Sequence, residues 1–168
     1  ELAERRRAAI ADMIAEQAGI ALLALNYQEA AKFYSKSADA TPAQNKRTKA
    51  SRYLFAGDAH RKKGTLKPGW AAYEQAMKIF QGLAGDDPSN AEAQRDLSVS
   101  YERIGEISAA RGDLAGAHEN YRKDLAIAKR LAGDDPSNAQ AQRDLMVSYA
   151  RLIDLEDEPR ERAAAILD

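Results

Sequence analysis

Three arginines at regular spacing are the residues whose chemistry can be stated most directly. Arg47, Arg95 and Arg143 follow one another at intervals of 48 residues. A guanidinium group binds a carboxylate through a planar fork of donors, so a row of three would bind an acidic peptide or a peptide C-terminus. A second interpretation is that Arg95 and Arg143 neutralise acids of the neighbouring turns and were copied when the sequence was duplicated. Both interpretations remain open.

Other side chains that could support catalysis or metal binding lack the neighbours that such chemistry requires. His60 and His118 have no cysteine and no Glu-x-x-His spacing around them. The pairs Asp86-Asp87 and Asp134-Asp135 stand outside any EF-hand pattern and fit turns between helices. Phosphate loops and nucleophile motifs do not occur. We therefore expect no enzymatic activity, no metal and no other cofactor.

Composition disfavours further classes of protein. The 168 residues include 25 basic and 26 acidic ones, so no positive field favours nucleic acid, and there is no cysteine for disulfide or thiolate chemistry. The longest apolar run, Ile20–Leu25, is far below the roughly 20 residues of a membrane span. We expect a cytoplasmic protein that binds neither nucleic acid nor membranes. Because the chain starts at Glu1 in a segment that already reads as helix, we expect it to be a piece of a longer protein.

An internal duplication indicates how the chain is built. Leu83–Arg103 and Leu131–Arg151 are identical at 18 of 21 positions. Self-similarity at a fixed period is typical of proteins that stack one supersecondary unit on the next. At the same spacing the chain repeats Tyr53, Tyr101 and Tyr149, and the pairs Gly57 and Gly105, Gly64 and Gly112, Leu66 and Leu114, Tyr73 and Tyr121, and Ile79 and Ile127.

Almost every segment is predicted to be helical. Strong helix formers dominate, and no stretch alternates with period two for long enough to be a strand. Gly64 and Gly112 predict tight turns between paired helices. The predicted helices span about 2–24, 27–40, 43–62, 67–84, 90–111, 114–132, 138–157 and 160–167.

Helix ends are predicted from glycine and serine. Gly85 and Gly133 are expected to form left-handed C-terminal caps. Ser89-x-x-Glu92 and Ser137-x-x-Gln140 have the pattern of capping boxes that begin the next helix.

The repeated residues resemble the tetratricopeptide repeat. In that family, helix A carries a bulky residue, then Leu-Gly and an aromatic, and helix B carries a small residue with an aromatic four positions later. The period of 48 exceeds the usual 34, Asp124 stands where the family prefers alanine, and Ser108 where it prefers an aromatic. The long unit is similar to tandem repeats of bacterial signalling proteins, which flank an effector domain. The matching residues are Tyr101, Ile104-Gly105, Gly112-Asp113-Leu114, Ala117, Tyr121 and Leu125, and, one repeat earlier, Tyr53, Ala56-Gly57, Gly64, Leu66, Gly69 and Tyr73.

The resemblance implies an all-α protein, a right-handed α-solenoid of stacked antiparallel helical hairpins over residues 1–168. Its repeats would span about 1–42, 43–88, 89–136 and 137–168, the last one truncated. Gly57 and Gly105 are expected to allow helix B to approach helix A closely, and Tyr73 and Tyr121 to fill the gap between neighbouring hairpins. The tyrosines at 53, 101 and 149 are expected in the core.

The resemblance also implies a function, because helix A faces of the family line a concave groove that binds peptides or partner helices. We expect a non-catalytic scaffold for protein–protein interaction, with an acidic or C-terminal peptide as the ligand that the arginine row would suit. The expected groove residues are Arg47, Ser51, Leu54, Asp58, Arg61, Arg95, Val99, Glu102, Glu106, Arg143, Val147, Ala150 and Asp154.

Self-association is the main alternative to this function. Terminal repeats without polar caps leave apolar faces open, and such faces stack on another copy. In that case the chain would form a homo-oligomer through its terminal repeats.

Overall fold

The chain is all-α over the residues that the structure describes. The computed structural model describes the backbone of residues 1–167 and the side chains of residues 1–157, and this part of the chain forms seven α-helices and no strand. The prediction of an all-α protein is therefore confirmed.

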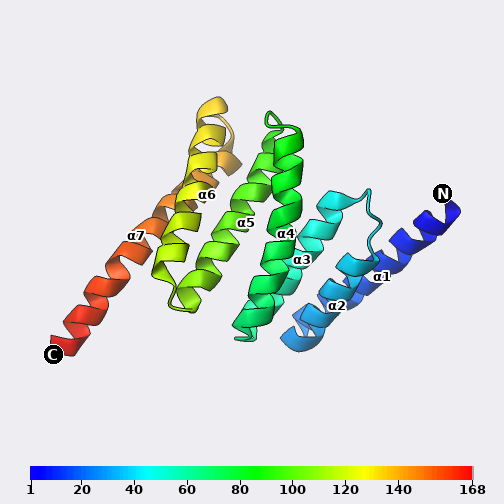
Figure 1. The fold of residues 1–168 in the computed structure, drawn as a ribbon, viewed down its shortest axis with the longest axis horizontal. Helices are drawn as coiled ribbons and strands as arrows, with labels where there is room; N and C mark the ends of the chain where they lie inside the picture. Colours follow the sequence, from blue (N-terminus) through cyan, green and yellow to red (C-terminus); the bar gives the residue numbers. More distant parts are fainter. Residues whose placement is uncertain (168) are drawn as a thin grey trace. The chain divides into compact units, whose positions relative to one another are not determined.

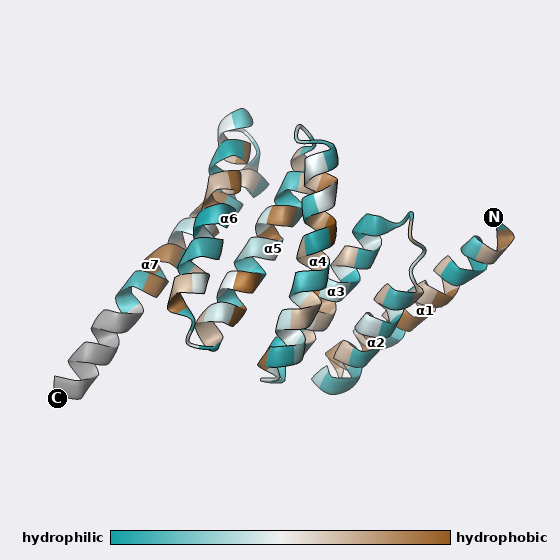
Figure 2. Cartoon of the chain, in the orientation of Figure 1, coloured by the Kyte–Doolittle hydropathy of each residue, from teal (hydrophilic) through white to brown (hydrophobic). Residues whose placement is uncertain are grey.

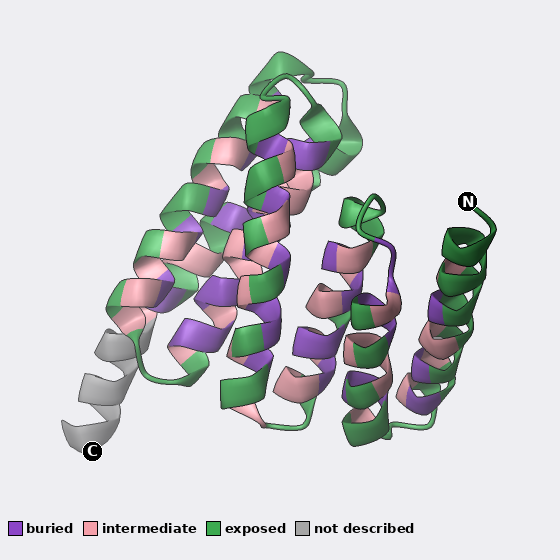
Figure 3. Cartoon of the chain, turned by 45° about the vertical axis from the view of Figure 1, so that its right-hand side comes forward, coloured by how far each residue is buried: buried purple, intermediate pink, exposed green. Residues whose placement is uncertain are grey.

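The helices belong to two compact units (Figure 1). The N-terminal unit, Glu1–Asp87, contains α1 (Leu2–Leu23), α2 (Tyr27–Ala40), α3 (Lys46–Lys62) and α4 (Leu66–Asp86). The C-terminal unit, Pro88–Asp168, contains α5 (Ala91–Ala110), α6 (Leu114–Asp134) and α7 (Ala139–Leu167). Within each unit every helix packs against the next one in the chain, and buried residues lie on the faces between adjacent helices (Figure 3).

Small residues form much of the core. The N-terminal unit buries a cluster of Ala21, Ala30, Ala31 and Ala59, with Leu22 and Phe33 packed against it. Alanine side chains let helix axes approach closely, so the core is thin and its larger side chains are few. Hydrophobic residues are dispersed along all helices (Figure 2), and none of the described helices is long and apolar enough to cross a bilayer.

Each unit contains one close contact between a glycine and a tyrosine ring. A Cβ atom at Gly57 would lie 2.4 Å from the ring of Tyr73, and one at Gly105 would lie 2.4 Å from the ring of Tyr121. The two glycines therefore permit the close approach of α3 to α4 and of α5 to α6, as predicted. Tyr121 also packs in one cluster with Leu155 of α7, so its ring lies between neighbouring helix pairs as expected.

The other repeated tyrosines are not in the core, and this prediction was wrong. Tyr149 is 43% exposed, and Tyr53 and Tyr101 are only partly buried. The buried stripe of α5 runs through Ser100, Ile104 and Ile107, and Tyr101 lies at its edge. Polar contacts stabilise these rings at the surface: the Tyr53 hydroxyl donates to Asp39 at 2.5 Å, and lysine ammonium groups lie 5.7 Å from the Tyr101 ring and 5.0 Å from the Tyr149 ring.

The tight turns between paired helices share one backbone geometry. Gly64 and Gly112 lie in the turns that were predicted for them, and their φ angles of +81° and +80° are in the left-handed region. The turn between α1 and α2 places Leu25 at the same point with φ +56°. Leucine is disfavoured in this conformation by roughly 1–2 kcal/mol. The turn is closed by backbone hydrogen bonds, from Leu25 N to Leu22 O at 3.0 Å and from Asn26 N to Ala21 O at 2.8 Å.

Two predicted helix ends lie elsewhere in the structure. Gly85 and Gly133 are inside α4 and α6, because these helices continue to the next aspartate and the chain leaves through extended residues with φ near −140°. That exit needs no left-handed residue.

The helices that follow are capped by asparagine, not by the predicted serines. The side chain of Asn90 accepts from Ala93 N, and that of Asn138 accepts from Ala141 N at 3.1 Å. The hydroxyl of Ser137 donates to Asp135 at 2.7 Å.

The predicted break between helices 138–157 and 160–167 is absent. The chain forms one helix, α7, over Ala139–Leu167. No glycine is present near residue 158 to end the helix, and the φ angle of a proline is itself compatible with helix. Side chains from residue 158 onward lie outside the described residues.

Candidate functional site

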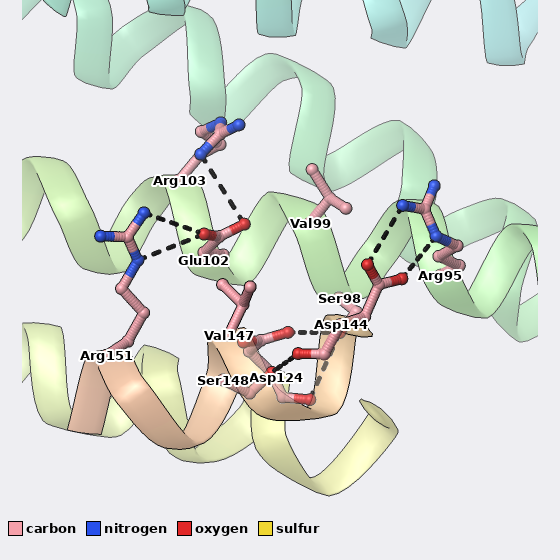
Figure 4. Close-up of a pocket in the computed structure, with 10 residues that line it drawn as sticks. All are labelled: Arg95, Ser98, Val99, Glu102, Arg103, Asp124, Asp144, Val147, Ser148 and Arg151. Carbon is pink, nitrogen blue, oxygen red and sulfur yellow. Dashed lines mark hydrogen bonds and ion pairs between the residues drawn. The ribbon is translucent and has the colours of Figure 1, made fainter. Parts of the chain in front are cut away.

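A cavity of about 480 Å³ lies among the three helices of the C-terminal unit (Figure 4). Its walls come from α5 and α7, the two helices that carry the duplicated sequence, and α6 contributes one residue, Asp124. The lining residues are Arg95, Ser98, Val99, Glu102, Arg103, Asp124, Asp144, Val147, Ser148 and Arg151.

The cavity has a buried floor and a more exposed rim. Asp124, Ser98 and Ser148 are 4%, 4% and 1% exposed, whereas Val147 is 44% exposed. Val99 and Val147 occupy equivalent positions of the duplication and give the walls an apolar part. The rim therefore combines aliphatic side chains with the arginines Arg95 and Arg151, whose side chains are 42% and 36% exposed, and the buried polar groups lie on the floor.

The floor is a buried carboxyl group. Ser98 Oγ donates a hydrogen bond to the Asp124 carboxylate and also lies 3.3 Å from the Asp124 backbone oxygen. Burial raises the pKa of Asp124 to about 6, and the negative charges of Glu102 and Asp144 act in the same direction. The hydroxyls of Ser98 and Ser148 lower the pKa but do not offset burial. This carboxyl therefore changes its charge near pH 6.

Arg95 forms a fork with Asp144 across the cavity. Its Nε lies 2.6 Å from Asp144 Oδ2 and its Nη2 lies 3.3 Å from Oδ1, so the pair joins α5 to α7. Gln140 Nε2 donates to the same carboxylate at 2.6 Å. Arg95 is thus held by a carboxylate of the same chain.

The opposite end of the cavity has a second set of ion pairs. Arg151 Nη2 of α7 lies 3.2 Å from Glu102 Oε1 and also pairs with Glu106. Arg103 Nη1 donates to Glu106 Oε2 at 3.1 Å and lies 3.7 Å from Glu102. Each of the three lining arginines is therefore compensated by a carboxylate.

The predicted groove residues of the C-terminal unit divide into three groups. Arg95, Val99, Glu102 and Val147 line the cavity, and Glu106 pairs with Arg151 beside it. The remaining three lie exposed on α7 outside the lining, where Arg143 donates to Gln140 at 3.1 Å; they are Arg143, Ala150 and Asp154.

The predicted groove residues of the N-terminal unit all lie on α3. The Ser51 hydroxyl donates to the backbone oxygen of Arg47 at 3.1 Å, and Asp58 accepts from the Tyr73 hydroxyl at 2.7 Å. Leu54 and Arg61 are partly buried. A continuous row of Arg47 with Arg95 and Arg143 stays a prediction.

Sequence reasoning missed most of the polar floor. The two buried partners in the C-terminal unit, Ser98 and Asp124, replace Ala50 and Ala76 of the preceding repeat, and both alanines are fully buried. The replacement of both alanines by polar residues in the next copy of the repeat was a signal that the sequence itself contained. Four more lining residues were missed, namely Arg103, Asp144, Ser148 and Arg151. The contacts of Asp144 and Arg151 with α5 join residues 45–49 positions apart and need the tertiary structure.

The two histidines lie outside the lining of this cavity. His60 Nδ1 lies 3.0 Å from Thr65 Oγ1 in the turn after α3, and burial, followed by the charge of Lys63, lowers its pKa. Among the described residues there is no group of three or more histidines, cysteines, aspartates or glutamates that could hold a metal ion.

No protein-family model matches this chain, and no curated protein matches it either.

Proposed function

We propose that the chain is a tetratricopeptide-like α-solenoid that serves as a non-catalytic module for binding a partner protein or peptide. The module would belong to a larger bacterial signalling or regulatory protein. The binding surface in the C-terminal unit is the face on which α5 and α7 lie side by side, which we call the α5–α7 face.

One observation carries this proposal. The cavity lies between the two helices that carry the same repeated sequence, and equivalent residues of both, Val99 with Val147 and Arg103 with Arg151, line it. A surface built from equivalent positions of successive helices is how repeat proteins bind extended partners. The rim combines apolar and charged side chains, which suits recognition of a peptide.

Selection of short random peptides against the full chain, followed by NMR mapping, tests the proposal. Selected peptides are expected to shift amide signals of α5 and α7. Val147→Glu should weaken their binding at least tenfold, about 1.4 kcal/mol, because a charge replaces an apolar wall at the rim. Ala115→Glu is the matched control, since Ala115 is exposed on α6 outside the lining of this cavity. Peptides that shift only other helices, or that bind the Val147→Glu variant unchanged, contradict the proposal.

A second candidate function is self-association, and exposed apolar side chains on α7 favour it. Met146 and Ile153 are 70% and 57% exposed. Their equivalents on α5, Ser98 and Gly105, are buried against α6. Helix α1 likewise exposes apolar residues, of which Leu23 is 88% exposed. A second copy of the chain would cover these faces.

Light scattering over a wide range of protein concentration tests self-association. The mass is expected to rise with concentration for the wild type and to stay that of a monomer for a Met146→Lys, Ile153→Lys double variant, because charges on an apolar interface oppose its burial. The control places two lysines at exposed positions of α6, Ala115→Lys with Ala126→Lys. A wild type that is monomeric throughout rules this function out.

A further inference from the structure

The floor of the cavity holds a buried acid whose charge is not balanced. Asp124 is 4% exposed, and its side-chain hydrogen bonds come from serine hydroxyls. Among the described side chains, no lysine or arginine forms an ion pair with it. A buried carboxylate without a cation is unfavourable, so a cation that reaches this position stabilises the folded chain.

The cations of the cavity itself are held by other acids. On α5, Arg95 is forked to Asp144, and Arg103 contacts Glu102 and Glu106; on α7, Arg151 contacts the same two glutamates. Moving any of them onto Asp124 would leave one of these acids uncompensated. Apart from a proton, a positive charge on Asp124 would therefore come from a ligand.

The same charges disfavour an acidic ligand. A carboxylate that entered the cavity would compete with Asp144 for Arg95 and with Glu102 for Arg151, and it would face the negative charge of Asp124. Like charges brought together at a protein interface suppress the binding of the wrong partner.

The walls fit a long side chain with a cationic end. Val99 and Val147 offer aliphatic contact near the rim, where three methylene groups of an arginine would pack. Below them, the carboxylates of Asp124, Glu102 and Asp144 keep acceptor lone pairs that their present partners do not fill. A guanidinium has five N–H donors in a fixed plane, against three on an ammonium, so it satisfies more of these acceptors.

We propose that this cavity binds an arginine side chain of a partner protein, with Asp124 as its counter-ion. The inference rests on the proposed function and names the chemistry that the α5–α7 face recognises. A proton and the guanidinium compete for the same carboxyl, so binding releases the proton when Asp124 is protonated.

NMR titration of the full chain with blocked short peptides tests the inference. The probe carries one arginine among alanines, and a second peptide carries citrulline, which has nearly the same shape without the charge. The arginine peptide is expected to saturate and to shift Ser98, Asp124 and Ser148, with the citrulline peptide at least tenfold weaker. A lysine peptide is expected to bind with an affinity between those of the arginine and citrulline peptides, because its ammonium group has fewer donors than a guanidinium.

Asp124→Asn removes the charge and keeps the size of the side chain. It should weaken the binding of the arginine peptide at least tenfold. Asp134→Asn is the matched control, because Asp134 lies exposed at the end of α6 outside the lining, and it should bind as the wild type does. Lowering the pH from about 7.5 to about 5 should weaken wild-type binding by roughly tenfold, because protonation of Asp124, whose pKa is about 6, removes the counter-ion. This pH dependence should be absent in Asp124→Asn.

Several results would overturn the inference. They are equal binding of the citrulline and arginine peptides, unchanged affinity in Asp124→Asn, and no saturable binding of the arginine peptide. If peptides from the random library bind the α5–α7 face without a basic residue and tolerate Asp124→Asn, this inference fails while the proposed function stands. If no peptide binds that face, both fail.

Discussion

Replacing Tyr121 with alanine is expected to lower the free energy of unfolding of the C-terminal unit by about 3–5 kcal/mol, as for other buried large aromatic residues. Tyr121 is 4% exposed, its ring lies against Gly105 of α5, and it packs with Ala117 and with Leu155 of α7. Removing the ring leaves a gap that touches all three helices. Hydrogen exchange of α5–α7 amides during denaturant titration measures the effect.

Gly105→Ala tests the other side of the same contact. The new Cβ atom would meet the Tyr121 ring at 2.4 Å, and because the ring is buried it has little room to move. Overpacking of this kind costs about 1–3 kcal/mol. In a Gly105→Ala, Tyr121→Ala double variant the clash is gone, so the two effects should not add.

Gly133→Ala is the control for this pair of variants. Gly133 lies in α6, and nothing lies within 4 Å of the position of its Cβ. The change should leave the stability equal or raise it by up to about 1 kcal/mol, from helix propensity. If Tyr121→Ala and Gly105→Ala both unfold at the denaturant midpoint of the wild type, the contact between Gly105 and Tyr121 is contradicted.

Asp124→Asn is expected to stabilise the C-terminal unit near neutral pH. Burial raises the pKa of Asp124 from 3.8 to about 6 in the folded chain, so the folded state binds the proton more tightly than the unfolded state does. The wild type should therefore lose stability as the pH rises from about 4 to about 6. A tenfold difference in proton affinity corresponds to about 1.4 kcal/mol, so the whole loss should be about 3 kcal/mol. Above this range the loss should level off.

The measurement is the difference in free energy of unfolding between Asp124→Asn and the wild type, followed from about pH 4 to about pH 7. Taking the difference cancels the contributions of the other acids. The difference should grow in favour of the variant across this range, and Asp154→Asn, at an exposed position, is the control. A flat difference for Asp124→Asn would mean that this carboxyl has an ordinary pKa.

Local signals in the sequence predicted most of the helices. Strong helix formers predicted the helical segments, and Gly64 and Gly112 predicted the turns because glycine adopts a left-handed backbone without steric cost. The 48-residue register predicted the contact of Gly105 with helix B correctly. Helix ends were harder to predict, since Asn90 and Ser89 are both capping residues and only the local backbone decides which one accepts the hydrogen bond.

The site depends on contacts that local signals do not contain. The sequence suggested that Arg95 binds a ligand carboxylate or an acid of a neighbouring turn, and the structure pairs it with Asp144 of α7. The departure of Asp124 from the alanine that the tetratricopeptide repeat prefers was visible in the sequence. Its burial, its serine partners and the cavity above it follow only once α5, α6 and α7 are packed together.

The repeated contact between a glycine and a tyrosine ring cannot continue beyond α7, because one residue of α7 differs from the repeat. Gly57 and Gly105 each receive a tyrosine from the following helix, and the equivalent residue of α7 is Ile153. The branched side chain of Ile153 fills the space that such a ring would occupy. A further copy of α6 placed on α7 could not use the same contact. One glycine-to-isoleucine difference thus removes from α7 the tyrosine contact that α3 and α5 make.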